Sequence, residues 1–444
     1  MHINNINNIN AIYAQSGGVT AVINSTACGV IETIHSINNI NQNFHVNSNH
    51  SNINHKIIGK VYAGINGIIG ILQEDLIDLS KEPSANIRGL KNTPAGAFGS
   101  CRYKLKDLAT NNKEYSRIIE VFKAHNIGYF FYNGGGDSQD TTYKISQISE
   151  KLGYPIKCIG IPKTIDNDLA FTDNCPGFGS VAKYVAISTL EASLDLASMA
   201  KNSTKVFILE VMGRNAGWIA ASAALATNDP NGPPHIILFP EIPFNKLKFL
   251  ELVQQSVSKF GYCVIVTSEG ITDHNQQPIA SVNNANKDQF GHTQLGGIAG
   301  NLAAIITQEL QFKTHWAVAD YLQRSARHIA SKVDVDQAYA LGKAAVEMAI
   351  AGKNAFMPII VRTNNDPYTW KIETANLSEV ANIEKKLPSN FIDHTGFNIT
   401  KKCREYLLPL IQGEDYPEYH QGIPKYTYLE KHFINKKLPE FIIK

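Results

Sequence analysis

The sequence predicts an α/β fold in which mainly parallel sheets are covered by helices. Three observations support this prediction: continuous apolar strands alternate with helical patterns, glycine clusters follow the strands, and hydrophobic residues make up 43% of the 444 residues. An uninterrupted apolar strand is typical of a parallel sheet that is buried on both faces. This much apolar material also excludes a wholly disordered chain.

The first strand is expected at 12–15, and a glycine turn and a helix with apolar residues from Ala21 to Ile34 follow it. The same order of strand, glycines and helix recurs along the chain. Further strands are expected at 128–132, 156–161, 205–211, 235–239 and 262–267, and further helices at 140–152 and from 213 to 226. Ligands of such sheets bind at the carboxyl ends of the strands, where these glycines lie.

Charge and composition exclude several classes of function. The 41 basic and 39 acidic residues give a net charge of +2, so bulk charge does not attract nucleic acid, and any bound anion must be captured by a local site. The six cysteines form no Cys-x-x-Cys pair and are expected to be reduced. No apolar run approaches the ~20 residues that span a membrane, and the N-terminus resembles no signal peptide, so we expect a cytoplasmic protein.

A stretch rich in Asn, Ile and His covers residues 36–56 and includes His45, His50 and His55. The three histidines have no fixed ligand spacing, and an insertion loop is the preferred interpretation over a metal site. The length of the chain corresponds to two or three domains.

Residues 133–138 read Asn-Gly-Gly-Gly-Asp-Ser at a strand end. Gly134, Gly135 and Gly136 let backbone amides approach an anion at the start of the next helix. The carboxylate of Asp137 is unexpected there; it caps the helix, reaches a Mg²⁺ ion or excludes a particular ligand. No Gly-Lys-Ser/Thr follows, so this is not the P-loop.

Lys163, Asp166 and Asp168 follow the strand at 156–161. If the segment is extended, both carboxylates point to similar sides, and Lys163 is expected to keep them ionised. One carboxylate can then accept a proton from a substrate hydroxyl. An Asp/Asn turn without chemistry is the alternative.

Later strand ends carry further polar groups. Arg214 offers a planar fork for phosphate or carboxylate, Glu269 can bind sugar hydroxyls, and residues 291–297 form a second glycine nest with a histidine. On a helix, Arg324 and Arg327 would share a face with Tyr321, either as a phosphate clamp or as a solvated surface.

Seven motifs, in this order, resemble the 6-phosphofructokinase family over residues 12–362. They are Gly17-Gly18, Gly99-Ser-Cys-Arg102, Gly134-Gly-Gly-Asp137-Ser138, Thr164-Ile-Asp166-Asn-Asp168, Met212-Gly-Arg214, Ser268-Glu269-Gly and Gly291-His-x-Gln-x-Gly-Gly297. The resemblance implies two similar α/β domains with the active site in the cleft between them. We therefore expect an N-terminal domain over 1–162, a C-terminal domain over 163–362 with the chain able to cross between them, and an extension over 363–444.

The resemblance also implies roles for individual residues. Asp166 is the expected general base, and Lys163 and Asp137 complete the catalytic group. Donor-phosphate ligands are Gly18, Arg102, Gly135 and Gly136, and sugar-phosphate ligands are Thr164, Ile165, Met212, Gly213, Arg214, Glu269, Tyr321 and Arg324. Lys205 lies where the family often has an arginine that is donated to a neighbouring subunit.

The two central loops match the pyrophosphate-dependent branch of the family. They read Gly-Gly-Gly-Asp-Ser and Pro-Lys-Thr-Ile-Asp, where ATP-using members have Gly-Gly-Asp-Gly-Ser and Pro-Gly-Thr-Ile-Asp. A carboxylate ~4 Å from the α-phosphate of ATP would cost about 4 kcal/mol at an effective dielectric of ~20. Leu295 replaces an arginine of bacterial ATP-using members, which points to the same branch. Gly136 stands where the family has a metal-binding aspartate, so Asp137, or the diphosphate and water, is expected to hold Mg²⁺.

The implied reaction is reversible phosphoryl transfer from pyrophosphate to the 1-hydroxyl of fructose 6-phosphate, which releases phosphate. The small-molecule partners are these sugar phosphates, pyrophosphate and phosphate; a homo-oligomer, preferably a dimer, is expected, and neither a membrane nor a nucleic acid. An ATP-dependent 6-phosphofructokinase and a non-catalytic sugar-phosphate-binding regulator are the alternatives.

Overall fold

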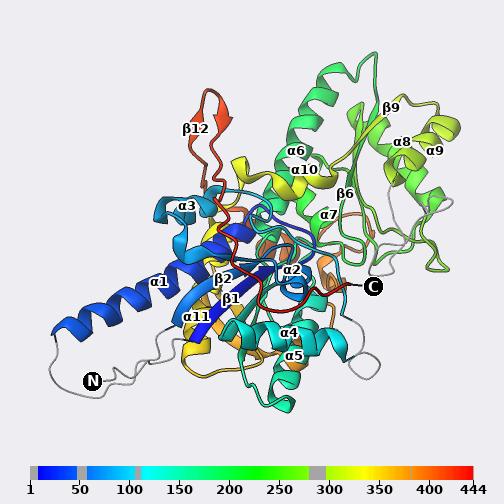
Figure 1. The fold of residues 1–444 in the computed structure, drawn as a ribbon. Helices are drawn as coiled ribbons and strands as arrows, with labels where there is room; N and C mark the ends of the chain where they lie inside the picture. Colours follow the sequence, from blue (N-terminus) through cyan, green and yellow to red (C-terminus); the bar gives the residue numbers. More distant parts are fainter. Residues whose placement is uncertain (1–8, 48–57, 106–111, 280–296, 382, 444) are drawn as a thin grey trace, which may run out of the picture.

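The computed structural model describes residues 9–47, 58–105, 112–279, 297–381 and 383–443 (Figure 1). The largest sheet has seven strands, in the order β11 (Tyr368–Asn376), β10 (Phe356–Asn365), β5 (Lys157–Pro162), β4 (Ile127–Gly134), β1 (Ile9–Gln15), β2 (Ile58–Gly64) and β3 (Leu76–Asp78). The strands from β10 to β2 run parallel, and the two edge strands, β11 and β3, are antiparallel to their neighbours. The predicted α/β fold is therefore confirmed.

A second sheet has four parallel strands, in the order β7 (Ile236–Leu238), β8 (Cys263–Ser268), β6 (Val206–Val211) and β9 (Thr314–Val318). The central strands of both sheets are almost entirely buried, as their apolar sequences predict. Each strand expected from the sequence corresponds to one of these strands. The majority of their ends agree to within one or two residues.

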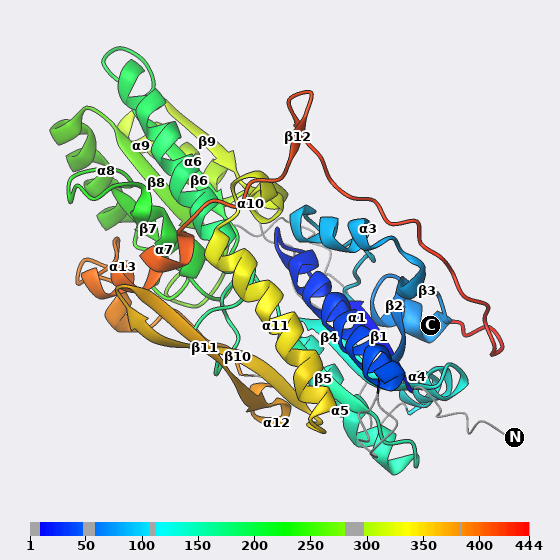
Figure 2. The same ribbon diagram turned by 90° about the vertical axis from the view of Figure 1, so that its left-hand side faces the viewer.

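Helices cover both faces of the large sheet. On one face, α1 (Ile23–Asn47) packs along α11 (Lys332–Ile350), and Figure 2 shows the two side by side. The opposite face is covered by α2 (Ile68–Gln73), α4 (Lys113–Ala124) and α5 (Gly136–Lys151). A short helix, α3 (Ser84–Gly89), lies beside α1.

The four-stranded sheet has its own two layers. One layer contains α6 (Phe178–Met199) and α7 (Trp218–Ser222), and the other contains α8 (Lys246–Phe260) and α9 (Ile298–Leu310). The remaining helices are α10 (Asp320–Ser325), α12 (Leu377–Val380) and α13 (Lys401–Leu407).

The chain passes between the two sheets four times along the described residues. It leaves the large sheet after β5, returns with α11 and β10, enters the second core again at Leu387, and packs on the first core once more at Leu429. The predicted boundary at residue 362 falls inside β10, because β10 pairs with β5 of the large sheet.

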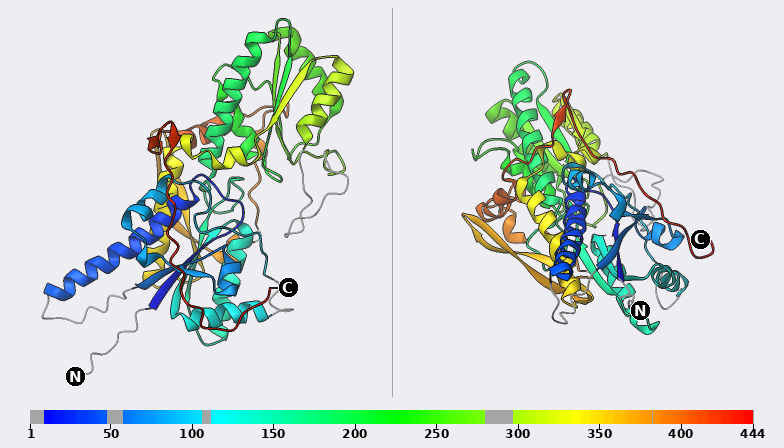
Figure 3. Two further views of the ribbon diagram at one scale, coloured as in Figure 1. Left: turned by 45° about the horizontal axis from the view of Figure 1, so that its top comes forward. Right: turned by 60° about the vertical axis from the view of Figure 1, so that its left-hand side comes forward.

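The C-terminal extension is part of both cores. Leu387, Phe391 and Leu407 are buried beside α6 and α7, whereas Ile434 and Leu438 pack on the large sheet. Between these regions a small hairpin, β12 (Tyr419–His420) and β13 (Ile423–Pro424), projects from the body (Figure 3).

Two local predictions have clear outcomes. The loop expected at 36–56 is wrong for residues 36–47, which continue α1; Ile37, three residues after the buried Ile34, packs on the core and extends the apolar face of the helix. His45 lies within this helix, and His50 and His55 lie outside the described residues. All six cysteines are free and buried, as expected. Within the described ranges, no helix is long and apolar enough to span a membrane.

Candidate active site

The carboxyl ends of the strands of both sheets border one cavity of about 450 Å³. It is lined by Ser16, Gly17, Gly18, Val19, Arg102, Gly135, Gly136, Asp137, Ser138, Lys163, Thr164, Ile165, Asp166, Asp168, Met212, Arg214, Asn215, Glu269, Asp320, Tyr321 and Arg324. Every site residue expected from the sequence is in this lining except Gly213. Seven separate segments meet here, and this convergence identifies the cavity as the candidate active site.

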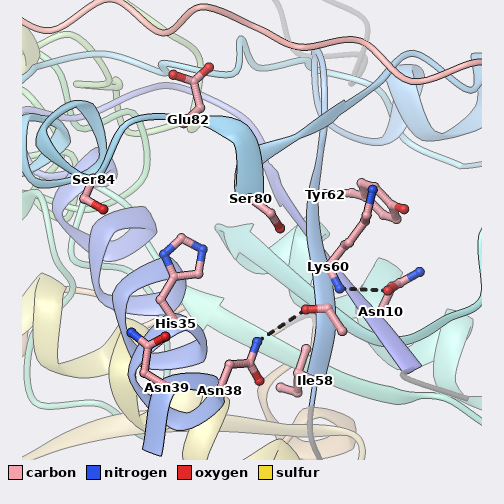
Figure 4. A pocket seen from close by; sticks show the side chains of 11 residues that line it. Asn10, His35, Asn38, Asn39, Ile58, Lys60, Tyr62, Ser80, Glu82 and Ser84 are labelled. Carbon is pink, nitrogen blue, oxygen red and sulfur yellow. Dashed lines mark hydrogen bonds between the residues drawn. The ribbon is translucent and has the colours of Figure 1, made fainter. Parts of the chain in front are cut away.

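A larger hollow of about 930 Å³ lies elsewhere, between α1 and the starts of β1 and β2 (Figure 4). It is at the amino ends of these strands, and its lysine, Lys60, is paired with Asp78 at 2.9 Å. Its described lining residues include no pair of carboxylates and no glycine nest, in contrast to the strand-end cavity.

Three cations surround the turn after β1. A side chain on Gly18 would put its Cβ 3.0 Å from the Arg324 guanidinium and 3.8 Å from that of Arg102. The carbonyl oxygen of Gly18 accepts a hydrogen bond of 2.6 Å from Lys163 Nζ. These cationic side chains thus lie close to the backbone of the turn, and together they form a positive wall suited to a polyanion.

Lys163 is buried in this wall. Burial, followed by the positive charge of Arg324, lowers its pKa to about 8, and the carboxylates of Asp168 and Asp166 oppose the change. The ammonium thus stays charged at neutral pH and lies between the turn after β1 and the two carboxylates.

Helix α5 begins at the glycine cluster and directs its amino end to the cavity. Its N-cap is Gly135, with no side-chain cap, so the interpretation of Asp137 as a helix cap is wrong. Asp137 instead forms an ion pair of 3.0 Å with Lys104, which the sequence analysis did not identify. Paired in this way, Asp137 presents less net negative charge to a donor than an isolated carboxylate would.

Asp166 and Asp168 both face the cavity. Between them, the buried Asn167 has a left-handed backbone with φ of 55°. Thr164 Oγ1 accepts a hydrogen bond of 3.1 Å from the backbone N–H of Asp166. The loop is therefore a tight turn whose two carboxylates share one side.

The proton affinity of this pair is raised. Burial, followed by Asp168 and Glu269, raises the pKa of Asp166 well above its ordinary value, and Lys163 acts in the opposite direction. Burial and Glu384 raise the pKa of Asp168. Lys163 lowers the pKa of Asp166, in the expected direction, but burial and the neighbouring carboxylates raise it by more. A base of raised pKa near neutrality is well matched to proton transfer.

The second sheet supplies the other wall. Met212 and Arg214 follow β6, and Glu269 follows β8. Burial raises the pKa of Glu269, and the neighbouring Arg214 partly offsets the increase. Gly213 has φ of 115°, and its carbonyl oxygen accepts a hydrogen bond of 2.6 Å from Ser268 Oγ, so it shapes the turn behind the lining.

Helix α10 places Tyr321 and Arg324 at the cavity, where the Arg324 guanidinium lies over the Tyr321 ring at 4.0 Å. The helix ends at Ser325, so Arg327 does not share this face. Arg327 is fully buried and binds Asn92, Asp415 and the backbone, which is a structural role.

The sequence analysis did not identify several lining or neighbouring residues. Ser16, Asn215 and Asp320 each adjoin or lie near a residue that was identified, and Glu384 lines an adjoining hollow with Asp137 and Asp168. Of the nest expected at 291–297, residues 291–296, with His292 and Leu295, lie outside the described residues, and Gly297 is the N-cap of α9. Lys205 binds backbone oxygens at the end of α6, including that of Lys201 at 3.2 Å.

Fixed cations around a site for a polyanion, with a carboxylate placed to accept a proton, are the parts that phosphoryl-transfer enzymes share. A family model described as phosphofructokinase matches residues 10–349, and the chain belongs to this family.

Several curated relatives and solved structures resemble the chain along almost its whole length. A pyrophosphate–fructose 6-phosphate 1-phosphotransferase of Halomonas elongata is 59% identical, over 97% of this chain and 99% of its own. The protein of that name from Methylococcus capsulatus is 56% identical, over 97% and 98%. The crystal structure of a pyrophosphate-dependent phosphofructokinase from Marinobacter aquaeolei has a TM-score of 0.87 and 57% identity, and the match covers 98% of this chain and all of that one.

Proposed function

We propose that the chain transfers a phosphoryl group reversibly from pyrophosphate to the 1-hydroxyl of fructose 6-phosphate, forming fructose 1,6-bisphosphate and phosphate. The observation that carries this proposal is the cavity itself, in which Asp166 lies beside a wall of three cations at the donor turn. The named activity of relatives that are 59% and 56% identical supports it.

Asp166 acts as the general base. Its carboxylate faces the cavity beside Thr164, and its ionised form, whose proton affinity burial raises, takes the proton of the sugar hydroxyl. The sugar oxygen then attacks the terminal phosphoryl group of pyrophosphate, and phosphate leaves. In the reverse direction, the protonated carboxyl returns the proton to the sugar oxygen.

The cations stabilise the charge that spreads over the transferred group. Lys163 is held at the turn after β1 by its hydrogen bond to the carbonyl oxygen of Gly18. Arg102 and Arg324 approach the backbone of the same turn. Groups fixed before the reaction need no reorganisation during it, which makes them effective in stabilising a transition state. Arg324, whose guanidinium lies over the Tyr321 ring, is proposed to bind the sugar phosphate. Arg214 and Glu269, which line the same cavity, are proposed to contact the sugar as well.

Mg²⁺ is part of the proposal. Among the described residues no three His, Cys, Asp or Glu side chains form a ready metal cage, which fits an ion held mainly by the diphosphate and water. Asp137 would contribute its second carboxylate oxygen, while the first stays on Lys104. Bound with the donor, the ion would neutralise charge on the diphosphate oxygens.

A donor assay tests the proposal. The purified chain, with fructose 6-phosphate and Mg²⁺, is given either pyrophosphate or ATP, and fructose 1,6-bisphosphate is measured. Turnover with pyrophosphate is expected. Turnover with ATP alone would establish the ATP-dependent alternative, and binding of fructose 6-phosphate without turnover would establish the non-catalytic one. In a second test, the variant Asp137→Gly with Lys163→Gly is expected to gain affinity for ATP.

We also propose a homo-oligomer, with a dimer as the first expectation. Strand β9 is an edge strand, and its Trp316 and Val318 are 52% and 47% exposed. An exposed apolar edge is a template for pairing with another chain. Light scattering on the wild type and on Trp316→Lys tests this: a dimer that becomes a monomer supports the edge as the interface.

A further inference from the structure

A short segment of the C-terminal extension, residues 383–387, runs directly behind the loop that carries Asp166 and Asp168. Glu384 forms an antiparallel bridge with Leu169, and the backbone N–H of Lys385 donates a hydrogen bond of 2.6 Å to the carbonyl oxygen of Asp168. The segment thus pairs with the active-site loop as a short strand would, although more than 200 residues separate the two in sequence.

The ammonium of Lys385 reaches further along the same loop. Its Nζ donates to the carbonyl oxygens of Asp173 at 2.8 Å and Thr172 at 3.0 Å, and lies 3.5 Å from Asn167 Oδ1. It also lies 5.4 Å from the centre of the Trp218 ring, whose N–H donates to the Lys385 carbonyl oxygen at 3.0 Å. One residue therefore fixes the loop at several points and ties it to α7 of the second sheet.

Asn167 connects this network to the two carboxylates. Its Oδ1 accepts a hydrogen bond of 3.0 Å from the backbone of Cys175, and its amide donates one of 3.0 Å to Tyr406, which is also in the extension. Because the Asn167 side chain is held on the far side of the turn, Asp166 and Asp168, on either side of it, are directed to the cavity.

Glu384 differs from Lys385 in charge, and its side chain is more exposed. Its side chain is exposed and lines a hollow with Gly136, Asp137 and Asp168. The charged groups that act on Asp166 are Asp168, Glu269, Lys163 and Glu384, and Lys385 acts on Asp168 as well. Adjacent residues of the extension thus act on the pair with opposite sign.

We propose that the C-terminal extension supplies two positioning residues to the active site: Lys385 holds the loop of Asp166 and Asp168 in place, and Glu384 puts a negative charge beside it. Neither residue is required to touch the substrates. The effect on turnover rests on the proposed role of Asp166 as the base, whereas the hold on the loop does not.

The kinetic test uses Lys385→Met and Glu384→Gln in the full chain, with kcat/KM for fructose 6-phosphate measured between pH 5.5 and 9. Removing the cation is expected to move the acid limb of the profile up by roughly half a pH unit or more and to lower kcat about tenfold or more. Removing the carboxylate is expected to move the limb down by a similar amount with little change in kcat. Lys385→Arg is expected to restore most of the profile.

Matched controls are Lys386→Met, an exposed lysine of the same segment, and Glu379→Gln, an exposed glutamate of α12. Neither is expected to move the profile. Limbs that stay in place in both test variants, or that move in the same direction, would overturn the electrostatic part of the proposal.

Hydrogen exchange provides a readout without turnover. Amides of residues 164–175 are expected to exchange about tenfold faster or more in Lys385→Met than in the wild type, with Lys386→Met unchanged. Unchanged exchange in this segment would overturn the hold on the loop. If the wild type does not use pyrophosphate, the proposed function fails, and the exchange result still decides the role of Lys385.

Discussion

The ion pair between Lys104 and Asp137 makes a specific prediction about the donor. Its two atoms are 3.0 Å apart, and the side chains are 53% and 39% exposed. Replacing Lys104 by Met leaves Asp137 with its full negative charge at the cavity. For a donor oxygen ~5 Å away, the repulsion is about 1 kcal/mol in bulk water and about 3 kcal/mol at an effective dielectric of ~20. Because the pair is exposed, the lower value applies, which corresponds to a roughly fivefold to tenfold lower affinity for the donor.

Initial-rate kinetics can measure this effect. KM for pyrophosphate is expected to rise fivefold to tenfold in Lys104→Met, whereas KM for fructose 6-phosphate stays within about twofold. Lys104→Arg, which keeps the charge, and Lys123→Met, which removes an exposed lysine of α4, are the controls. An unchanged KM for pyrophosphate, or an equal rise for both substrates, would refute the argument that Lys104 offsets the charge of Asp137.

Three further predictions concern catalysis and stability. Asp166→Asn is expected to lower kcat by several orders of magnitude, since the base is lost; near-normal turnover would rule out its role. Because the pKa of Lys163 is lowered to about 8, its ammonium loses its proton as the pH rises through that value. Forward turnover should therefore fall above about pH 8. In Lys163→Arg this fall should begin at a higher pH. Arg327→Met should reduce the free energy of unfolding by about 3–5 kcal/mol in urea titrations, because Asp415 loses its buried partner; a loss below 1 kcal/mol would contradict this reasoning.

The convergence of the site could be predicted from the sequence because it follows from a general property of parallel sheets. Strands that run in the same direction end at the same edge, so Gly135 after β4 and Lys163 after β5 are necessarily neighbours. Apolar runs and glycines mark these ends locally. For this reason the strand positions and most of the cavity lining were predictable without any knowledge of tertiary contacts.

Other features depend on contacts between distant segments and have no local signal. The pairing of β10 with β5 joins residues almost 200 positions apart, and the sequence of β10 reads equally well as a strand of either sheet. Lys385 is one of many lysines in the extension, and only its hydrogen bonds to the loop distinguish it. The end of α10 before Arg327 was also not predictable, because no glycine or proline marks it.

The four passages of the chain between the two sheets bear on how substrates enter. Two halves joined by one or two linkers can swing apart about a hinge, but here four covalent connections hold them, and Lys385 and Trp218 bridge them as well. A wide swing would strain several connections at once. We therefore expect access to depend on the movement of exposed side chains at the rim, such as Tyr321, and a chain cut at any single connection to remain one particle until it is denatured.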